Sequence, residues 1–374
     1  MSAAAALRTA AWPALAEYVH ERFGAEIEHI DRIGGEAGPK EFGYGDVLRV
    51  VLRGGHQHEI VVHTARRGGF GHDTLADRAG EALLPWETFN SLPAHVHALD
   101  VGSVDGSGRM HSLGDVRDFF LVTAYAHGEP YFKDLERIGR TAVATSEDVA
   151  RAERLALHLA RIHRDKKDAP ELWNRRIRDL VGGHECIAGL LDSYDGHFEP
   201  GVPSREVRRL IEHWAVDWRH RLMPRSGRLC RVHGDFHPWN VLFDGEGLSR
   251  RMTLLDRSRG EWGEAADDLA AMSINYVFFS LRSHHDSDGP YATLFRKFFD
   301  TWLEEMGDED ALRVIAPYFV WRALVVGSPV WYPKLAGDVR TRLFEIVAHV
   351  MQRDRLDLDD LDALFSPPPP LSRL

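Results

Sequence analysis

The sequence predicts an α+β protein of two lobes, in which a small N-terminal lobe with an antiparallel β-sheet and one helix precedes a larger, mainly helical C-terminal lobe. Three observations support this fold class. The chain has 374 residues, of which 44% are hydrophobic, so it can bury a sizeable core and favours two lobes over one small domain. Short runs of alternating apolar residues, typical of strands, occupy residues 25–62. After Gly128, apolar residues recur at helical spacing instead.

The composition of the chain limits which kinds of molecule the protein is expected to bind. The formal net charge of -11 argues against a nucleic-acid partner and is compatible with a cationic substrate. Cys186 and Cys230 cannot form a disulfide framework. Residues 13–23 read as an amphipathic helix rather than a signal peptide, and the apolar run 317–333 is interrupted by Arg322. We therefore expect a cytoplasmic protein without nucleic-acid or membrane partners, and its oligomeric state stays open.

The predicted N-terminal lobe contains a helix, a glycine-rich segment and five strands. The helix over residues 75–92 carries Glu81. The glycine-rich segment 34–45 contains Gly35 and Gly38, and glycine allows backbone N–H groups to approach a phosphate closely. The strands are expected at residues 27–33, 46–52, 59–63, 99–102 and 119–125.

The predicted C-terminal lobe consists largely of helices. Residues 150–163 have apolar side chains at helical spacing, and His163 at the end of this helix is expected to be packed rather than to bind a ligand. The proline-rich segment 366–370 predicts a frayed tail. Further helices are expected at residues 206–221, 267–279, 291–306, 311–326 and 338–354.

Polar residues that could transfer a proton or bind a metal lie at the ends of a predicted β-hairpin in this second lobe. Two short apolar runs, residues 241–243 and 252–255, flank a turn-forming cluster and are typical of a hairpin. Asp235 and Asn240 lie in the loop before the hairpin, and Asp256 follows its second strand. Folding the hairpin brings these three residues to one edge, which is therefore a candidate active site.

The spacing suits phosphoryl transfer, in which a protein mainly positions a nucleophile and neutralises charge. A carboxylate accepts the proton of the attacking hydroxyl, while oxygen ligands hold Mg²⁺ on the nucleotide phosphates. The segment HGDFHPWN at residues 233–240, followed by LLD at 254–256, resembles the catalytic loop and metal-binding aspartate of the aminoglycoside phosphotransferase and choline kinase group, which has a protein-kinase-like fold. The resemblance implies that Asp235 is the catalytic base and that Asn240 and Asp256 bind magnesium.

The resemblance extends beyond the hairpin. Residues 263–269, GEAADDL, are similar to the G-x-x-x-D-L-A helix start of that family. The resemblance implies that Asp268 braces the catalytic loop. Asp267 could instead cap the helix. Arg257 directly follows the metal aspartate; an arginine there could stabilise the transferring phosphate or pair with a nearby acid such as Glu261.

The family resemblance also implies cofactors, a substrate class and lobe boundaries. The cofactors are ATP and Mg²⁺, and the substrate is a small molecule with a hydroxyl group, such as an aminoglycoside, an amino alcohol or a sugar. Residues 1–126 form the nucleotide-binding lobe, 127–366 the helical lobe with the substrate pocket, and 367–374 a flexible tail. The glycine-rich segment becomes the lid over the nucleotide. The adenine-binding hinge is expected at Thr123, Ala124 and Ala126.

One position departs from the family pattern. The third strand should end in a lysine that pairs with the nucleotide phosphates and with a glutamate of the next helix, and this chain has His63 there. A neutral imidazole replaces an ammonium poorly, so His63 would act as a protonated imidazolium, or Arg66 or Arg67 would take its place. Glu81 is the candidate partner on the helix.

Three alternatives remain beside the kinase interpretation. A pseudokinase-like binder of nucleotide or metabolite would explain the missing lysine, but it has no need of three catalytic residues. Asp235 and His237 also form a D-x-H pair, as at dinuclear-metal phosphoesterase sites, yet the further ligand clusters of such sites are absent from the sequence. A protein kinase would carry D-F-G and A-P-E motifs, which the sequence lacks.

Overall fold

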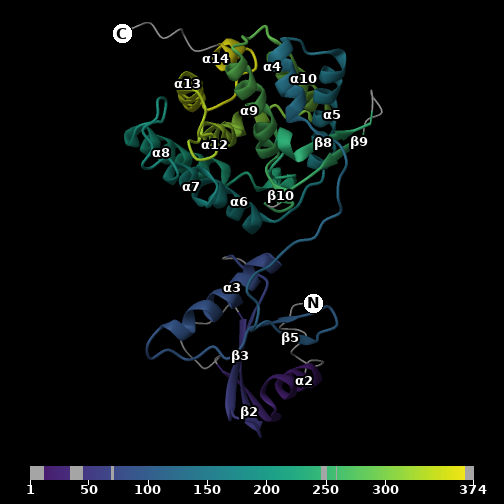
Figure 1. The fold of residues 1–374 in the computed structure, drawn as a ribbon, viewed down its shortest axis with the longest axis vertical. Coiled ribbons are helices and arrows are strands. Elements are labelled where there is room, and N and C mark those ends of the chain that lie inside the picture. The colour runs from purple at the N-terminus through teal and green to yellow at the C-terminus, as the bar shows by residue number, and fades with distance from the viewer. Residues whose placement is uncertain (1–11, 34–44, 69–70, 246–250, 258, 367–374) are drawn as a thin grey trace. The chain divides into compact units, whose positions relative to one another are not determined.

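The chain forms two compact units, one comprising residues 1–123 and the other residues 124–374 (Figure 1). The computed structural model describes residues 12–33, 45–68, 71–245, 251–257 and 259–366. The glycine-rich segment with Gly35 and Gly38 lies outside the described residues, as does the tail 367–374. The assignment of a nucleotide lid therefore stays a prediction.

A three-stranded antiparallel sheet forms the centre of the first unit. Its strands pair in the order β1 (Glu26–Ile33), β2 (Gly45–Arg53), β3 (Glu59–Ala65). Helix α2 (Trp12–Phe23) packs on one face of this sheet through the buried side chains of Leu15 and Val19. Ile60 and Val62 of β3 belong to the same cluster, as the two-residue period of a strand requires. The first three predicted strands and the N-terminal helix are confirmed.

The helix after β3 begins with a capping box formed by Thr74 and Asp77. Thr74 accepts the N–H of Asp77 at its hydroxyl, and the carboxylate of Asp77 accepts the N–H of Thr74, so two free backbone donors are satisfied reciprocally. This helix, α3 (Leu75–Thr88), gives way to a 3₁₀ turn, η1 (Phe89–Ser91). The helix therefore ends at Thr88 rather than at Leu92.

The last two of the five strands predicted for this lobe, at residues 99–102 and 119–125, do not form as expected. Strand β4 (Gly102–Val104) pairs with β5 (Met110–Ser112) in a separate two-stranded hairpin, and the predicted strand 99–102 overlaps it only at Gly102. The Asp105 side chain closes the hairpin turn by accepting the N–H groups of Ser107 and Arg109. Within the described chain, residues 119–125 form no strand, because aromatic and β-branched residues supply strand propensity but no hydrogen-bonding partner.

Helices make up most of the second unit. Helix α9 (Ala265–Ser283) is buried along most of its length and packs against α10 and α12 (Figure 1). The other helical segments are α4 (Phe132–Thr141), α5 (Ser146–His163), α6 (Pro170–Gly182), α7 (Ile187–Asp192), α8 (Arg205–Leu222), η2 (Ser226–Arg228), η3 (Pro238–Asn240), α10 (Pro290–Met306), α11 (Ala311–Val314), α12 (Ala316–Gly327), α13 (Gly337–Arg353) and α14 (Leu361–Phe365).

One predicted helix is divided in two. The sequence predicts a continuous helix over residues 311–326, but α11 ends at Val314 and α12 begins at Ala316. Pro317 explains the division, because a proline lacks the backbone N–H that a helix interior needs and is tolerated in the first turn. Among the described residues, no helix has the length and apolar character needed to cross a membrane.

The predicted hairpin is confirmed and belongs to a three-stranded sheet. Strand β8 (Val241–Asp244) pairs antiparallel with β9 (Arg251–Leu254), with Val241 opposite Leu254. Strand β6 (Glu129–Pro130) pairs with the other edge of β8. A second short pair, β7 (Cys230–Arg231) with β10 (Trp262–Gly263), joins the chain before the catalytic loop to the chain before α9.

Candidate active site

The loop of residues 233–240 is anchored by Asp268 in the first turn of α9. The Asp268 carboxylate accepts the N–H of His233 at Oδ2 and the N–H of Gly234 at Oδ1, both at 2.8 Å. Gly234 has a φ of +86°, a backbone conformation that glycine adopts without steric cost. The turn thereby directs both N–H groups at one carboxylate, and the prediction that Asp268 braces the loop is confirmed.

His163 at the end of α5 completes this brace. Its Nδ1 accepts the indole N–H of Trp302 at 3.0 Å, so Nε2 carries the proton that faces Asp268 Oδ2 at 3.1 Å. Both His163 and Asp268 are fully buried. Burial would raise the pKa of Asp268, but the hydrogen bond from His163 lowers the pKa below its ordinary value. His163 is thus a packed residue, as the sequence predicts.

Asp235 lies in this braced loop with its carboxylate held from two sides. Arg322 Nη1 donates to Asp235 Oδ1 at 2.5 Å, and His237 Nε2 lies 3.4 Å from Oδ2. Burial would raise the pKa of Asp235, but the hydrogen bond from His237 and the charge of Arg322 hold the pKa well below its ordinary value. The carboxylate is therefore ionised and oriented at neutral pH.

Asn240 and Asp256 lie at the same end of the β8–β9 hairpin. Asn240 Nδ2 donates to the carbonyl of Asp235 at 3.1 Å, and the N–H of Leu255 donates to the carbonyl of Asn240 at 2.9 Å. Asp256 follows Leu255 with a φ of +50°, a left-handed conformation that is uncommon outside glycine and concentrates at functional sites. The hairpin thus brings the two predicted metal ligands to one edge.

The chemistry of this donor set fits Mg²⁺. The Asn240 amide and the exposed Asp256 carboxylate offer hard oxygen ligands, and Mg²⁺ usually takes one or two carboxylates beside substrate phosphates. In the described part of the chain, His, Cys, Asp and Glu residues form no group of three or more that could hold a metal. The set therefore suits a metal carried by a nucleotide better than a site made by protein alone.

The two arginines after Asp256 differ in what their side chains contact. The Arg257 guanidinium donates to the carbonyl of Val232 at 2.7 and 3.0 Å, so it holds backbone. Arg259 Nε lies 3.9 Å from Asp235 Oδ1, and this buried atom has no hydrogen-bond partner among the described residues. Of the two arginines that follow Asp256, Arg259 is thus the one that lies beside the Asp235 carboxylate.

Asp267 does not cap α9. The side chain of Glu264 caps that helix by accepting the N–H of Ala266, whereas Asp267 Oδ1 accepts from Nε and Nη2 of Arg322 at 3.1 and 2.5 Å. The interpretation of Asp267 as a cap is therefore wrong. The physical reason is that Arg322 reaches α9 from α12, which offers Asp267 a charged partner within the core.

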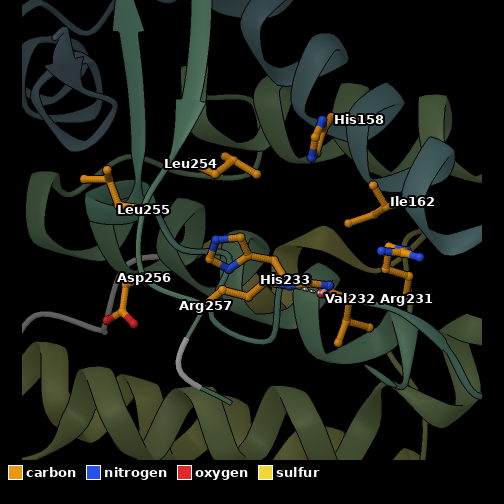
Figure 2. Close-up of a pocket in the computed structure, with 9 residues that line it drawn as sticks. All are labelled: His158, Ile162, Arg231, Val232, His233, Leu254, Leu255, Asp256 and Arg257. Atoms are coloured by element: carbon orange, nitrogen blue, oxygen red, sulfur yellow. Dashed lines mark hydrogen bonds between the residues drawn. The ribbon is translucent and has the colours of Figure 1, made fainter. Parts of the chain in front are cut away.

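A cavity of about 280 Å³ adjoins the catalytic loop (Figure 2). His158 and Ile162 of α5 lie on one side of it, and Leu254, Leu255 and Asp256 lie on the other (Figure 2). Burial lowers the pKa of His158 to about 4, so this imidazole is neutral at pH 7. The cavity borders a predicted metal ligand without presenting a charged imidazole to it.

The described residues of the first unit that were predicted at the phosphate-binding site include His63, Arg66 and Glu81. His63 is exposed on β3, between residues that face α2. Arg66 donates to the buried Asp46 carboxylate at 2.6 Å, and Glu81 lies 3.8 Å from His72. The expected pairing of Glu81 with His63 is therefore wrong, because the buried His72 imidazole takes that place. Thr123, Ala124 and Ala126 lie without regular structure at the boundary between the units.

Sequence reasoning missed Arg322 as a site residue. A signal was present, since Arg322 is the charge that interrupts the apolar run 317–333. A lone arginine in an otherwise buried helix requires a partner, because an unpaired charge in the core is costly. The sequence could not indicate that this partner is Asp235, which is 87 residues away along the chain.

A loop aspartate that is kept ionised beside two oxygen ligands is an arrangement that phosphotransferases use. Comparison with protein families agrees: the model of the APH phosphotransferase enzyme family matches residues 94–307. The chain therefore belongs to the phosphotransferase enzyme family. No curated protein sequence matches it.

Solved structures similar to this chain include three small-molecule phosphotransferases. A glucosamine kinase in complex with glucosamine, ADP and inorganic phosphate is 18% identical with a TM-score of 0.35, over 61% of this chain and 58% of that kinase. A choline kinase from Cryptosporidium parvum Iowa II is 11% identical with a TM-score of 0.37, over 94% and 97%. A spectinomycin phosphotransferase in complex with ADP and spectinomycin is 12% identical with a TM-score of 0.31, over 91% and 96%. The chain thus spans less than two thirds of the glucosamine kinase.

Proposed function

We propose that the protein transfers the γ-phosphate of ATP, with Mg²⁺, to a hydroxyl group of a small molecule. The observation that carries this proposal is the geometry around Asp235. Its carboxylate is ionised, its loop is braced by Asp268, and the hairpin brings Asn240 and Asp256 to the same edge. This is the set of groups that a hydroxyl acceptor and a metal-bound nucleotide require.

Each residue has a separate task in this proposal. Asp235 Oδ2 receives the acceptor hydroxyl and takes its proton, since Oδ1 is engaged by Arg322. Asn240 and Asp256 would hold Mg²⁺, which supplies charge neutralisation at the phosphates when bound. The unpaired Nε of Arg259 provides a donor for an oxygen next to Asp235.

An acceptor screen tests the proposed function. The purified protein is incubated with Mg²⁺, ATP and panels of aminoglycosides, amino alcohols, sugars and nucleosides, and ³¹P NMR detects a phosphate ester. We expect one panel to yield an ester together with ADP, and Asp235→Asn to abolish the signal. If nucleotide binds but no panel yields an ester or ADP, the result favours the alternative, a pseudokinase-like nucleotide or metabolite binder, which His63 at the lysine position would also fit.

Metal binding is expected to depend on the nucleotide. Two protein oxygen ligands form a weak cage for an ion that loses its water reluctantly, so nucleotide-free protein should bind Mg²⁺ weakly and the ATP complex should bind it well. Isothermal titration calorimetry with and without a non-hydrolysable ATP analogue measures both affinities. Asp256→Asn should weaken Mg²⁺ binding to the complex with the ATP analogue and leave Mg²⁺ binding to nucleotide-free protein unchanged. Tight Mg²⁺ binding to nucleotide-free protein contradicts the assignment of the ligands.

His63 remains our candidate for the cation that contacts the phosphates, because Arg66 pairs with Asp46 and Arg257 donates to backbone; Arg67 is the alternative. An imidazole is positively charged only when protonated, so nucleotide affinity should fall as pH rises from about 6 to about 8. His63→Lys, which keeps its charge across this range, should bind nucleotide more tightly than wild type at pH 8.

Fluorescence titration of a nucleotide analogue across this pH range measures the affinity of wild type, His63→Ala and His63→Lys. His58→Ala is the matched control, since His58 is another exposed histidine next to β3. Its profile should follow that of wild type. A flat profile for wild type, together with unchanged affinity in His63→Ala, would remove His63 from the site and leave Arg67 as the remaining candidate.

A further inference from the structure

Arg322 connects the catalytic loop to two helices through a single guanidinium group. Nη1 donates to Asp235 Oδ1 at 2.5 Å, and Nη2 donates to the carbonyl of Gly234 at 2.9 Å. Nε and Nη2 donate to Asp267 Oδ1 on α9. The side chain is buried, and its guanidinium lies over the Trp321 ring at 4.0 Å. Contacts on three sides leave the guanidinium little freedom to change its orientation.

The Asp235 carboxylate, in turn, depends on Arg322 for its orientation. Its other carboxylate contacts are longer: His237 at 3.4 Å, Asn240 Nδ2 at 3.5 Å and Arg259 at 3.9 Å. A charge-assisted hydrogen bond of 2.5 Å is the strongest of these, so it decides which way the carboxylate plane faces. Loss of Arg322 would free the carboxylate to rotate.

We propose that Arg322 and Asp267 form a positioning pair for phosphoryl transfer: Asp267 holds the Arg322 guanidinium, and Arg322 directs the Asp235 carboxylate so that Oδ2 faces the acceptor hydroxyl. The expected effect on kcat rests on the proposed function, whereas the contact between Arg322 and Asp267 does not. Neither residue touches the reacting atoms, so both act through Asp235. The pair also connects the catalytic loop to α9 and α12.

Asp267 makes this pair sensitive to pH. Burial and the neighbouring charge of Asp268 raise the pKa of Asp267 to about 6, although the charge and hydrogen bonds of Arg322 lower it. A carboxyl group with a raised pKa takes up its proton as pH falls through that value. Arg322 then loses the charge that holds it towards α9, so the guanidinium no longer fixes the orientation of the Asp235 carboxylate. The charged and titratable groups that face Asp267 are Arg322 and Tyr318 of α12, Asp268 of α9, Asp235 and Arg259 of the adjacent loops, and Cys186 before α7.

The kinetic test uses Arg322→Lys, Arg322→Met and Asp267→Asn on the acceptor that the screen identifies. Arg322→Met should lower kcat by roughly 10²-fold, the cost of a misplaced catalytic group, with KM for MgATP unchanged. Arg322→Lys should recover part of that loss, because it restores the charge without the fork of donors. Wild-type kcat should fall as pH drops below about 6, and Asp267→Asn should remain at the low-pH level across pH 5–8.

Arg340→Lys is the matched control. Arg340 is also a buried arginine that donates to carbonyl groups, on α13, and it makes no contact with the catalytic loop in the described structure. Its substitution should lower the melting temperature while kcat per folded protein and the pH profile stay as in wild type. If Arg322→Met fails to fold, Arg322→Lys and Asp267→Asn still decide the question. Wild-type kcat in Arg322→Lys, or a wild-type pH profile in Asp267→Asn, overturns the proposal.

A second readout needs neither acceptor nor turnover. In protein labelled with [γ-¹³C]aspartate, the signal that disappears in Asp267→Asn reports the protonation of Asp267. It should titrate near pH 6 in wild type and at higher pH in Arg322→Met, because removal of the cation favours the neutral acid. An unchanged titration in Arg322→Met overturns the pair itself. A shifted titration in a protein that yields no ester in any panel confirms the pair and rejects only the proposed function.

Discussion

Asp235→Asn is expected to lower kcat by roughly 10²–10⁴-fold, the range for loss of a general base. The amide that replaces the carboxylate cannot take the proton of the acceptor hydroxyl, although it keeps nearly the same shape. The protein should remain folded and bind nucleotide, because Arg322 keeps Asp267 and the Gly234 carbonyl as partners. Steady-state kinetics on the identified acceptor, with nucleotide affinity measured in parallel, check this result.

The control for this variant is Asp244→Asn. Asp244 ends strand β8 of the same hairpin and lies 3.6 Å from Arg251, in an exposed ion pair at the far end from the catalytic loop. Exposed ion pairs contribute little stability, so both kcat and the melting temperature should stay near wild type. Wild-type turnover in Asp235→Asn would refute the assignment of the base.

Asp268→Asn is expected to cost roughly 1–3 kcal/mol of unfolding free energy, the cost of leaving a buried hydrogen-bond donor without an acceptor. Asp268 is fully buried and accepts three hydrogen bonds, from His233, Gly234 and His163. An asparagine side chain would turn its own N–H₂ group towards one of these donors. The catalytic loop should then lose its shape together with its activity. Urea denaturation measures the stability.

Asp267→Asn serves as the neighbouring control for stability. Burial raises the pKa of Asp267 to about 6, so a neutral side chain is less costly at that position and the loss should be smaller. The pKa of Asp268 is shifted in the opposite direction, below its ordinary value. The ionised Asp268 carboxylate therefore stabilises the folded protein above about pH 4, and this stabilisation is lost as pH falls further. The difference between wild type and Asp268→Asn should therefore shrink below about pH 4. Equal losses for both variants at pH 7 would contradict this account.

Local patterns in the sequence were enough to predict the β8–β9 hairpin and the polar residues at its edge, whereas the role of the loop before it came from the family resemblance. The β8–β9 pair follows from two short apolar runs around a turn, and the three strands of the first unit follow from their alternation. Each of these elements is decided by residues within about ten positions of one another, which is the range that hydrophobic periodicity and turn chemistry cover. The division of the predicted helix 311–326 also has a local cause, Pro317, which apolar spacing alone does not reveal.

Contacts between distant segments were decided only by the tertiary structure. The partner of Asp235 is Arg322 on α12, and Arg259 rather than Arg257 lies near the same carboxylate. Asp267 pairs with Arg322 instead of capping its helix. Residues 119–125 are rich in strand-forming residues but have no strand partner in the described chain. The sequence determined which side chains can accept a proton or bind a metal, because residue type and local spacing follow directly from it. The packing of α9 and α12 decided which of them meet, since an ion pair in the core depends on how helices far apart in the chain come together.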